Sequence, residues 1–590
     1  MIRVPILCRG LLVFVIALGS TCLFAQLHDN SWVVGYANTL TPNDEFGHAK
    51  ITFSNGFPEI QEYHTDIYSF WHTNATMSDA DGRWIFSFNG IDVENADFER
   101  MENGLQLNET NANDYGLRQG ALCLPWPGDA DRYALVYQER SLSVSPLFFY
   151  GATVEFAEID MRLDQGLGAV TTKRQELKRD SLQLGKLSAL RHGNGRDWWV
   201  HINRYNSARF YRYLFDPVGF TLIDSFDVDF PLETMNAVGQ RCFSTDGRYF
   251  AEYNTTGPDT GYFLDLFEVD RCSGLFYNQQ QIKIGEGELF VASGCAFSPN
   301  SRFVYVSMQQ YILQYDLWAP DVAVSRDTVA VYDGFADPFA TPFNMAQLAS
   351  DGKIYLSTGN ATPYLHIIHQ PDLPGDSCSV EQRGIKLPVN MFMGLPTFPH
   401  YRLGPQDGSP CDTLGLDNMP RAAYRWASDT LHEREVAFHD LSYYEPATWT
   451  WDFGDGATST VRHPTHIYAA DGYYQVCLTV SNVNGSHTKC REVNIGLPVG
   501  TAEAHALLGS IEVYPNPTYG QLTVALERPL TTVATFELHD ALGRCVHREQ
   551  LAPGYHQQTI TLPALSAGLY YYALRQRGRV LYSGPLSVQE

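Results

Sequence analysis

The stretch Ser298-Pro299-Asn300-Ser301-Arg302-Phe303-Val304-Tyr305 decides the fold of this chain. Its first half consists of turn-forming residues, and its second half is rich in aromatic and β-branched residues, which favour strands. The same order returns in Ser244–Phe250 and in Ser350–Tyr355. We therefore expect each of these stretches to be the tight turn and second strand of a β-hairpin.

Six such hairpins follow one another along the chain. The last three turns are spaced by about 50 residues, and a period of this size with short strands indicates a β-propeller. We therefore expect each hairpin to begin one blade. The other three hairpin segments are Ser78–Phe86, Pro127–Tyr133 and Gly193–Trp199.

The two ends of this region supply further strands. We expect strands at Ala49–Phe53 and Glu59–Tyr63 before the first hairpin, and at Met393–Phe398 and His400–Leu403 after the last. Pairing these ends in a seventh blade would remove the exposed edges that an open ring of sheets would have. The predicted fold class for 26–405 is an all-β, seven-bladed propeller closed by both ends of the domain, with six or eight blades as alternatives.

Several phrases of this region stand out, among them Thr76–Gly90, Arg191–Val200 and Ala296–Val306. They resemble phrases of an uncharacterised group of large extracellular proteins with WD-repeat-like propellers. The resemblance implies a propeller fold and a place at the cell surface, and it implies no particular chemistry.

A second module is expected over 421–496. Its signature consists of Trp451, Asp452, Phe453, Gly454, Asp455, Gly456, His466, Tyr468, Gly472 and Tyr474. This signature resembles that of the PKD domain, which implies an immunoglobulin-like β-sandwich with Trp451 and Phe453 in the core. PKD domains serve as spacers, as adhesion modules and as contacts to carbohydrate or protein, so the resemblance is specific for fold and weak for function.

Cys477 and Cys490 in this module are candidates for a disulfide. A two-residue turn at Asn484-Gly485 would place them diagonally, at about 7–8 Å, which is too far for a relaxed bond. A four-residue loop over Asn482–Gly485 places them directly opposite. We prefer the four-residue loop, with Gly485 in a left-handed conformation.

The C-terminal residues 510–590 contain three short motifs in a fixed order, with the residues Pro515, Asn516, Pro517, Gly520, Asp540, Gly543, Arg544, Gly568 and Tyr570. These motifs resemble those of the type A sorting domain of cargo for the bacterial type IX secretion system. The resemblance implies a small β-sandwich that the secretion machinery recognises and that is then removed, with the cargo released or attached to surface lipopolysaccharide. We expect linkers at 406–420 and 497–509, with removal in the second.

Residues 1–25 have the pattern of a secretory signal peptide. Arg3 and Arg9 precede the apolar run Leu11–Leu18, and we expect cleavage after Ala25. Lipidation at Cys22 is the rival reading. No later stretch approaches the roughly 20 apolar residues of a membrane-spanning helix, so we expect no membrane span.

Composition excludes some partners. Hydrophobic residues make up 44% of the chain, which is ample for packed cores, and the formal net charge is −25. Such an acidic surface repels nucleic acid and anionic membranes. We therefore expect a soluble exported protein whose ligand is a surface glycan or another protein.

Cysteines outside the leader and the PKD-like module are harder to assign. An oxidising destination permits disulfides, and Cys378 with Cys411 is one pairing that would tie the propeller to the following linker. No pair has the CxxC spacing of a zinc site. The unassigned cysteines are Cys123, Cys242, Cys272, Cys295 and Cys545.

A search for catalytic chemistry gives no motif. His463 and His466 flank a proline in the PKD phrase, and His366 and His369 would lie on opposite faces of a strand, so neither pair suits a metal. The run Asp79–Gly82 lacks the 12-residue loop of an EF-hand. We predict no catalytic residue and no cofactor, apart from weak structural calcium.

The tryptophans allow two interpretations. Trp71, Trp126, Trp318 and the pair Trp198-Trp199 would either line a sugar-binding face or pack between strands, and we favour packing. The predicted function is non-enzymatic adhesion or recognition at the cell surface. The alternative is a glycan-active enzyme or carbohydrate-binding protein with its site in the propeller channel, which a channel plugged by apolar side chains would exclude.

Overall fold

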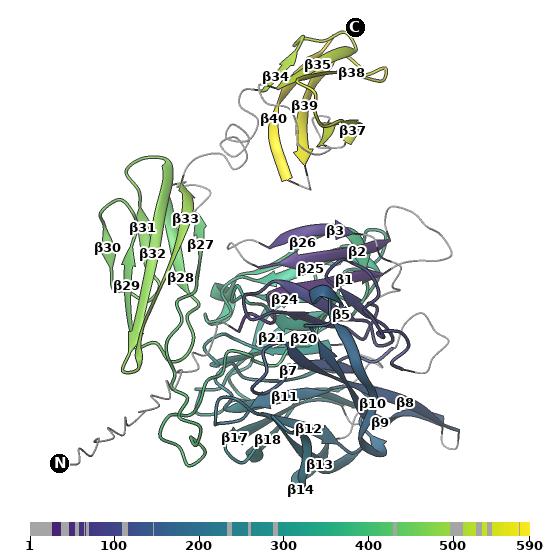
Figure 1. The fold of residues 1–590 in the computed structure, drawn as a ribbon, viewed down its shortest axis with the longest axis vertical. Coiled ribbons are helices and arrows are strands. Elements are labelled where there is room, and N and C mark those ends of the chain that lie inside the picture. Colours follow the sequence, from purple (N-terminus) through teal and green to yellow (C-terminus); the bar gives the residue numbers. More distant parts are fainter. Residues whose placement is uncertain are drawn as a thin grey trace, which may run out of the picture.

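The structure is a computed structural model of the chain, and it contains almost no helix (Figure 1). The only non-strand elements among the described residues are two 3₁₀ turns, η1 (Asp164–Gly166) and η2 (Gly375–Cys378). The structure describes residues 26–36, 46–53, 58–63, 65, 70–108, 116–144, 147–232, 239–257, 261–286, 293–428, 434–495, 511–526, 534–539, 545–576 and 579–589.

The described residues of 26–405 form seven antiparallel sheets, each a meander of strands consecutive in sequence. The first two sheets have three strands each, and their strands are β1 (Ser31–Tyr36), β2 (Gly47–Thr52), β3 (Glu59–Tyr63), β4 (Ala75–Ser78), β5 (Trp84–Phe88) and β6 (Val93–Asn95). The third and fourth sheets have four strands each: β7 (Ala121–Pro125), β8 (Arg132–Val144), β9 (Leu147–Asp160), β10 (Ala169–Leu182), β11 (Ser188–Arg191), β12 (Trp198–Asn203), β13 (Ser207–Asp216) and β14 (Gly219–Leu232).

The remaining three sheets also have four strands each. The fifth consists of β15 (Arg241–Phe243), β16 (Tyr249–Gly257), β17 (Gly261–Asp270) and β18 (Leu275–Gly285). The sixth consists of β19 (Ser293–Phe297), β20 (Phe303–Met308), β21 (Tyr311–Asp316) and β22 (Asp327–Val331). The seventh consists of β23 (Phe343–Leu348), β24 (Ile354–Thr358), β25 (Thr362–Ile368) and β26 (Val380–Met391).

Each of the six predicted hairpins joins the first two strands of one sheet, from the second sheet to the seventh. In the sixth sheet, for example, Ser298–Arg302 connects β19 to β20, and the backbone N–H of Ser301 donates to the carbonyl of Ser298. Gly247 and Gly352 occupy the corresponding turns with φ of +72° and +78°, a conformation that glycine adopts without strain. The turn-forming residues therefore predict where the first two strands of each of these sheets are joined.

The expected strands at the far end of this region are absent. Residues 393–403 form no strand, and the first sheet has three strands of its own. Pro396 and Pro399 lack the N–H groups that a ladder requires. The prediction that both ends of the region contribute strands to one blade is therefore wrong. The ends meet instead through packing, because β26 lies against β1, β2 and β3.

Residues 393–404, which we call the closing segment, run across the first strands of the sheets. The Tyr401 hydroxyl donates to the carbonyl of Cys123 on β7 at 2.9 Å, and the His400 ring donates to the carbonyl of Phe243 on β15 at 2.9 Å. Phe398 packs against Trp32 of β1. One extended stretch thus touches sheets that are far apart in the sequence.

The closing segment fills the space between these strands. A cavity of about 20 Å³, enough for about one water molecule, remains between Thr397–His400 and the first strands of the third, fourth and fifth sheets. Apolar side chains supply much of the filling, because Phe398 and the fully buried Tyr401 both belong to hydrophobic clusters shared by several sheets.

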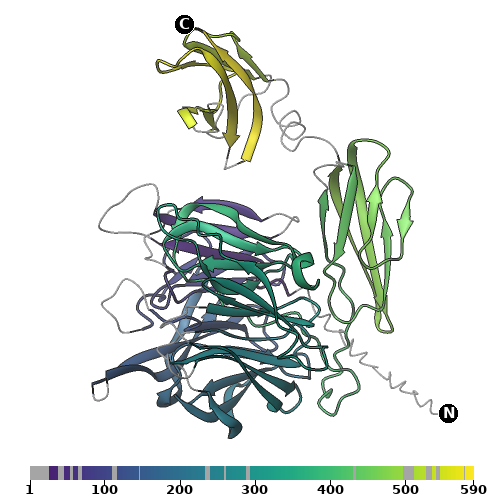
Figure 2. The ribbon, with the colours of Figure 1, turned by 180° about the vertical axis from the view of Figure 1, so that it is seen from behind.

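The PKD-like module is a sandwich of two sheets that lies beside the body of sheets in both views (Figures 1 and 2). Its core contains Trp451, Phe453, Val476 and Leu478, all buried. One sheet consists of β27 (Tyr424–Ser428), β28 (Glu435–Asp440) and β31 (Thr465–Ile467). The other consists of β29 (Thr448–Asp452), β30 (Thr458–Ser459), β32 (Gly472–Asn482) and β33 (Gly485–Ile495).

The register of the β32–β33 hairpin confirms the prediction for its cysteines. Cys477 lies directly opposite Cys490, and the two form a disulfide. The hairpin closes one pair further than expected, because Asn482 pairs with Gly485 and leaves Val483-Asn484 as the turn. The Asn482 side chain explains the tighter turn, since it accepts a hydrogen bond from the backbone N–H of Asn484 at 2.9 Å.

The second disulfide joins Cys272 to Cys411, residues that are 139 positions apart. The predicted pairing of Cys378 with Cys411 is therefore wrong. Cys378 is buried in η2 with its thiol reduced, whereas Cys411 lies in the linker close to Gly193 and Cys272. The disulfide holds the linker against the fourth and fifth sheets.

The C-terminal module is a separate sandwich of two sheets around a core that includes Phe536, Leu538, Leu574 and Leu586. One sheet consists of β34 (Ile511–Tyr514), β35 (Gln521–Leu526) and β38 (Gln557–Thr561). The other consists of β36 (Ala534–His539), β37 (Cys545–Leu551), β39 (Gly568–Gln576) and β40 (Arg579–Val588).

If the closing segment holds the sheets together, truncating Tyr401 should destabilise them strongly. We expect Tyr401→Ala to reduce the free energy of unfolding by about 3–5 kcal/mol, as for other buried aromatic residues. Differential scanning calorimetry would show this as a lower transition temperature. The matched control is Tyr473→Ala, at an exposed tyrosine of the PKD-like module. Equal effects of the two substitutions would contradict a structural role for the segment.

Candidate functional site

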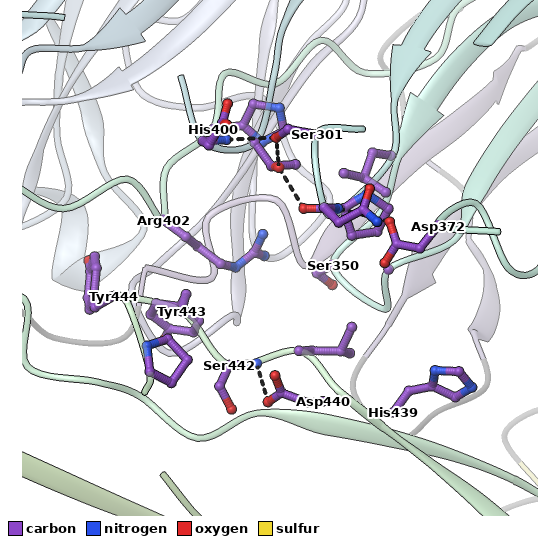
Figure 3. A pocket seen from close by; sticks show the side chains of 18 of the residues that line it. Ser301, Ser350, Asp372, His400, Arg402, His439, Asp440, Ser442, Tyr443 and Tyr444 are labelled. Atoms are coloured by element: carbon purple, nitrogen blue, oxygen red, sulfur yellow. Dashed lines mark hydrogen bonds between the residues drawn. The ribbon is translucent and has the colours of Figure 1, made fainter. Parts of the chain in front are cut away.

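A cavity lies where the PKD-like module meets the body of sheets (Figure 3). It has a volume of about 520 Å³, which is in the range of small-ligand sites. One wall consists of hairpin turns of the fifth, sixth and seventh sheets, with Asp246, Asn300 and Ser350 at their tips. The opposite wall consists of residues 439–446 and Arg462-His463 of the PKD-like module.

Hydrogen bonds between neighbouring turns hold the first wall in place. The Thr245 hydroxyl donates to the carbonyl of Pro299 at 2.6 Å, and the backbone N–H of Asp246 donates to the Ser301 hydroxyl at 3.1 Å. The backbone N–H of Asn300 donates to the Asp372 carboxylate at 2.9 Å. Because the fifth-sheet turn bonds to the sixth-sheet turn, and the sixth-sheet turn bonds to the loop between β25 and β26, this wall presents its polar groups in fixed positions.

The opposite wall is organised around Asp440, which is buried. Its carboxylate accepts a hydrogen bond from Arg462 at 2.9 Å and another from the backbone N–H of Ser442 at 3.0 Å. The backbone N–H of Asp440 donates to the His463 ring at 3.1 Å. The His439 ring lies beside His463, with a centroid separation of 5.5 Å, and accepts from the Gln370 side chain at 3.3 Å.

Arg402 of the closing segment reaches between the two walls (Figure 3). Its guanidinium forms an ion pair with Asp29, with one hydrogen bond of 3.0 Å. Arg271 lies at another part of the lining and donates to the carbonyl of Gly404 at 2.6 Å. The segment that fills the space between the sheets thus also supplies a charged group to the cavity.

Two buried polar atoms of the lining have no protein partner within hydrogen-bonding distance. They are the Tyr444 hydroxyl and the Nε of Arg425. Tyr444 has a φ of +63°, which is uncommon for a residue with a Cβ atom. Buried polar atoms normally have a partner, so these two atoms are exceptions in the described structure.

Burial keeps the histidines of the cavity neutral. Desolvation lowers the pKa of His439 to about 3 and that of His400 to about 4, and it also lowers the pKa of His463. The positive charge of Arg425 lowers the pKa of His439 further. Desolvation raises the pKa of Asp372. At neutral pH the histidine rings therefore offer one donor and one acceptor each.

The two walls are in tight contact around the cavity. A Cβ atom at Gly352 would lie 2.6 Å from the Leu441 side chain, so the PKD-like module approaches this turn closely. Arg425 of β27 donates to the carbonyl of His369 at 3.2 Å. These contacts, together with the Cys272–Cys411 disulfide, fix the position of the module.

The residues of the PKD signature lie in the sandwich and not at the cavity. The His466 ring stacks on Phe453 at 4.2 Å and bonds to Asp455 at 2.8 Å, while the Tyr468 hydroxyl donates to the carbonyl of Phe453. Gly454 and Gly456 have positive φ in the turn after β29. The signature therefore describes the fold of the module, and its neighbours at 439–446 supply the cavity wall.

The motif residues of the C-terminal module are partly described. The Asn516 side chain donates to the carbonyl of Pro585 and accepts from the backbone N–H of Ser587, both at 2.9 Å. The Tyr570 hydroxyl donates to the carbonyl of Ser566 at 2.9 Å. The other motif positions at Asp540, Gly543 and Arg544 lie outside the described residues, as do the leader 1–25 and the linker 497–509.

The tryptophans follow the packing interpretation in part. Trp126, Trp198 and Trp199 are buried, whereas Trp71 is 40% and Trp318 62% exposed. They do not gather at the cavity. His366 is buried and accepts from the backbone N–H of Arg383, and His369 bonds to Glu381, so the two histidines have separate partners.

Sequence reasoning missed the cavity because its residues come from many separate parts of the chain, between Thr245 and His463. The only signal was the repeated turn, whose tips form one wall. Within the described ranges, no group of three or more His, Cys, Asp or Glu side chains is arranged to hold a metal ion.

Two family matches agree with these modules. Residues 424–496 match the PKD domain, and residues 512–583 match the secretion system C-terminal sorting domain. The second match indicates export by the type IX system to the cell surface or the extracellular space. Among the described residues, no helix is long and apolar enough to cross a membrane.

Similarity to individual proteins is limited to short segments or to distant folds. The chain is 48% identical to collagenase ColA of Bacillus cereus over 42 residues, which are 7% of this chain and 4% of that protein. The chain thus spans a small fraction of the curated relatives it matches. The PKD1 domain of the Vibrio cholerae metalloprotease PrtV is 29% identical, with a TM-score of 0.13, over 13% of this chain and 99% of that domain. A protein from Lactobacillus plantarum covers 62% of this chain and 99% of its own length, with 12% identity and a TM-score of 0.38.

Acid should loosen the contact between the two modules. Because the pKa of His439 is held near 3 in the docked state, the undocked state binds more protons between about pH 6.5 and 3. The contact is therefore most stable above pH 6.5 and weakens as the pH falls. We expect small-angle X-ray scattering to show expansion of the protein at about pH 4–5.

The matched variant His439→Gln keeps a polar side chain and removes this titration. Its expansion should shift to lower pH relative to the unaltered protein. The other buried histidines, such as His28 and His201, remain and act as an internal control for acid unfolding of the sheets. Identical pH profiles for the two proteins would show that His439 does not control the contact.

Proposed function

We propose that this exported protein is a non-enzymatic recognition protein of the cell surface, and that it binds a hydroxyl-rich glycan in the cavity between its two modules. The observation that supports this most strongly is the cavity itself. It is about 520 Å³ in volume and is lined by fixed polar groups from both modules. Sites for small ligands are usually concave and placed between modules in this way.

The chemistry of the lining suits sugar hydroxyls. A hydroxyl both donates and accepts, and the cavity offers donors from Arg402 and Arg462 beside the Asp372 carboxylate as an acceptor. The arginines are already paired with carboxylates, so the cavity presents no large excess of one charge. Tyr443 adds a ring to the same wall, and aromatic rings pack well against the apolar faces of sugars.

We further propose that the seven sheets are the blades of a propeller. The contact of β26 with the first sheet would close the ring, and the closing segment would occupy its axis. In this arrangement the predicted hairpin turns share one face of the ring, and the PKD-like module covers part of that face. The filled axis argues against an enzyme with its site in a central channel.

The sorting domain indicates the export route, but it does not indicate whether the protein stays attached to the cell surface. We propose that residues 510–590 are removed after export and that the two remaining modules act at the surface, either attached to lipopolysaccharide or released. Recognition of a glycan fits both outcomes, because a released protein can bind the same polymers that the cell presents. The proposed function requires no cofactor, and weak structural calcium would not alter it.

Filling the cavity should abolish glycan binding. Leu373 lines the cavity and has an exposed side chain. The substitution Leu373→Trp puts a larger side chain in its place. On an array of bacterial surface polysaccharides we expect the unaltered protein to bind, and the variant to bind at least about tenfold more weakly, the equivalent of about 1.4 kcal/mol. Leu414→Trp is the control, at an exposed leucine away from the lining. An array without hits, or equal binding by Leu373→Trp, would contradict the proposal.

Export should depend on the C-terminal module. Removing residues 505–590 deletes the sandwich that matches the sorting domain, and we expect the shortened protein to remain in the periplasm. Cell fractionation followed by immunoblotting measures this directly. The Leu414→Trp variant with an intact C-terminus serves as the export-competent control. Arrival of the shortened protein at the cell surface would show that another signal directs export.

A further inference from the structure

Two cysteines that are not in a disulfide face each other across neighbouring sheets. Cys242 lies on β15 of the fifth sheet, and Cys295 lies on β19 of the sixth. Their sulfur atoms are 3.7 Å apart. The described cysteines outside the two disulfides also include Cys123 and Cys378. Among these described cysteines, Cys242 and Cys295 are the pair whose sulfurs are in contact.

The surrounding backbone holds the two sulfurs in this position. The Cys295 thiol is 3.2 Å from the carbonyl of Gln240, and its backbone N–H donates to the Gln240 side chain at 3.3 Å. The same side chain donates to the carbonyl of Ala346 on β23 at 2.7 Å. Gln240 thereby ties the start of the fifth sheet to the sixth and seventh, so β15 and β19 cannot move far apart.

We propose that Cys242 and Cys295 form a third disulfide in the exported protein. A disulfide requires sulfur atoms about 2.05 Å apart, so the pair must close by a little under 2 Å. The two strands already bring the sulfurs into contact, so rotation of the side chains is the movement that the bond requires. The destination is oxidising, and the same chain forms two other disulfides there.

The reaction is a thiol–disulfide exchange with an external disulfide, carried by an oxidoreductase or by a small molecule. The Cys242 thiolate attacks one sulfur of that disulfide, forming a mixed disulfide and releasing one thiol. The Cys295 thiolate then attacks the Cys242 sulfur and releases the second thiol. Two protein thiols are oxidised, one external disulfide is reduced, and the two thiol protons pass to the released thiolates.

Burial of the Cys242 thiol determines when during folding the bond can form. Burial raises the pKa of the Cys242 thiol well above its usual value, which makes its thiolate scarce in the folded protein. The bond should therefore form before the fifth and sixth sheets complete their packing, while the oxidant can still reach the thiols. Once formed, it joins two sheets that are otherwise held by side-chain packing and hydrogen bonds.

The test is a disulfide map of the full exported protein recovered from the cell surface or medium. The protein is denatured without reductant, alkylated with iodoacetamide, digested and analysed by mass spectrometry. We expect a peptide pair linked through Cys242 and Cys295, in addition to the Cys272–Cys411 and Cys477–Cys490 pairs, with Cys123 alkylated. Alkylation of both Cys242 and Cys295 in this sample would overturn the proposal.

A second measurement tests the consequence for stability. The Cys242→Ser, Cys295→Ser double variant should unfold at a lower urea concentration than the unaltered protein under oxidising conditions, and at the same concentration once dithiothreitol reduces both proteins. Cys123→Ser, at a buried cysteine without a sulfur neighbour in the described structure, is the control. An equal difference with and without reductant would assign the effect to packing alone and contradict the proposal. If the double variant fails to fold, the disulfide map of the unaltered protein decides the question.

Discussion

Packing of residues 393–404 across the first strands of the sheets is the constraint on which the rest of the structure depends. Tyr401 bonds to the third sheet, His400 to the fifth, and Phe398 packs against the first. A single stretch therefore forms hydrogen bonds and packing contacts with buried strands that are far apart in the sequence. It also delivers the chain to the linker, whose Cys411 is bonded to Cys272, and so sets where the PKD-like module begins.

The cavity between the modules has both polar and apolar lining because both partners contribute turns and loops. Hairpin tips such as Asn300 and loop residues such as Ser442 carry backbone groups that must remain hydrogen-bonded, so the two surfaces cannot close completely. Paired charges, including Arg462 with Asp440, line the space that remains. A hydroxyl-rich ligand matches such a surface better than an apolar one does, which links the architecture to the proposed recognition of a glycan.

Sequence reasoning succeeded where the deciding interactions are local. The turn at Ser298–Arg302 and the register of Cys477 with Cys490 follow from residues close in the chain. It failed where the interacting residues are far apart in the sequence. The closing segment has the hydrophobic character of strands, yet its prolines and its long-range contacts keep it from pairing. The disulfide of Cys272 joins residues 139 positions apart, and the cavity combines turns and loops whose proximity no local pattern reveals.

The contacts between the sheets and the PKD-like module should hold them as one rigid body that creates the cavity. Distance measurement by electron paramagnetic resonance tests this most directly, with spin labels on Val218→Cys and Val483→Cys, both at fully exposed turns, in a Cys545→Ser background. A rigid body predicts one narrow distance distribution centred on the separation of these turns in the structure. A broad distribution would show that the modules move independently and that the cavity is not a fixed site.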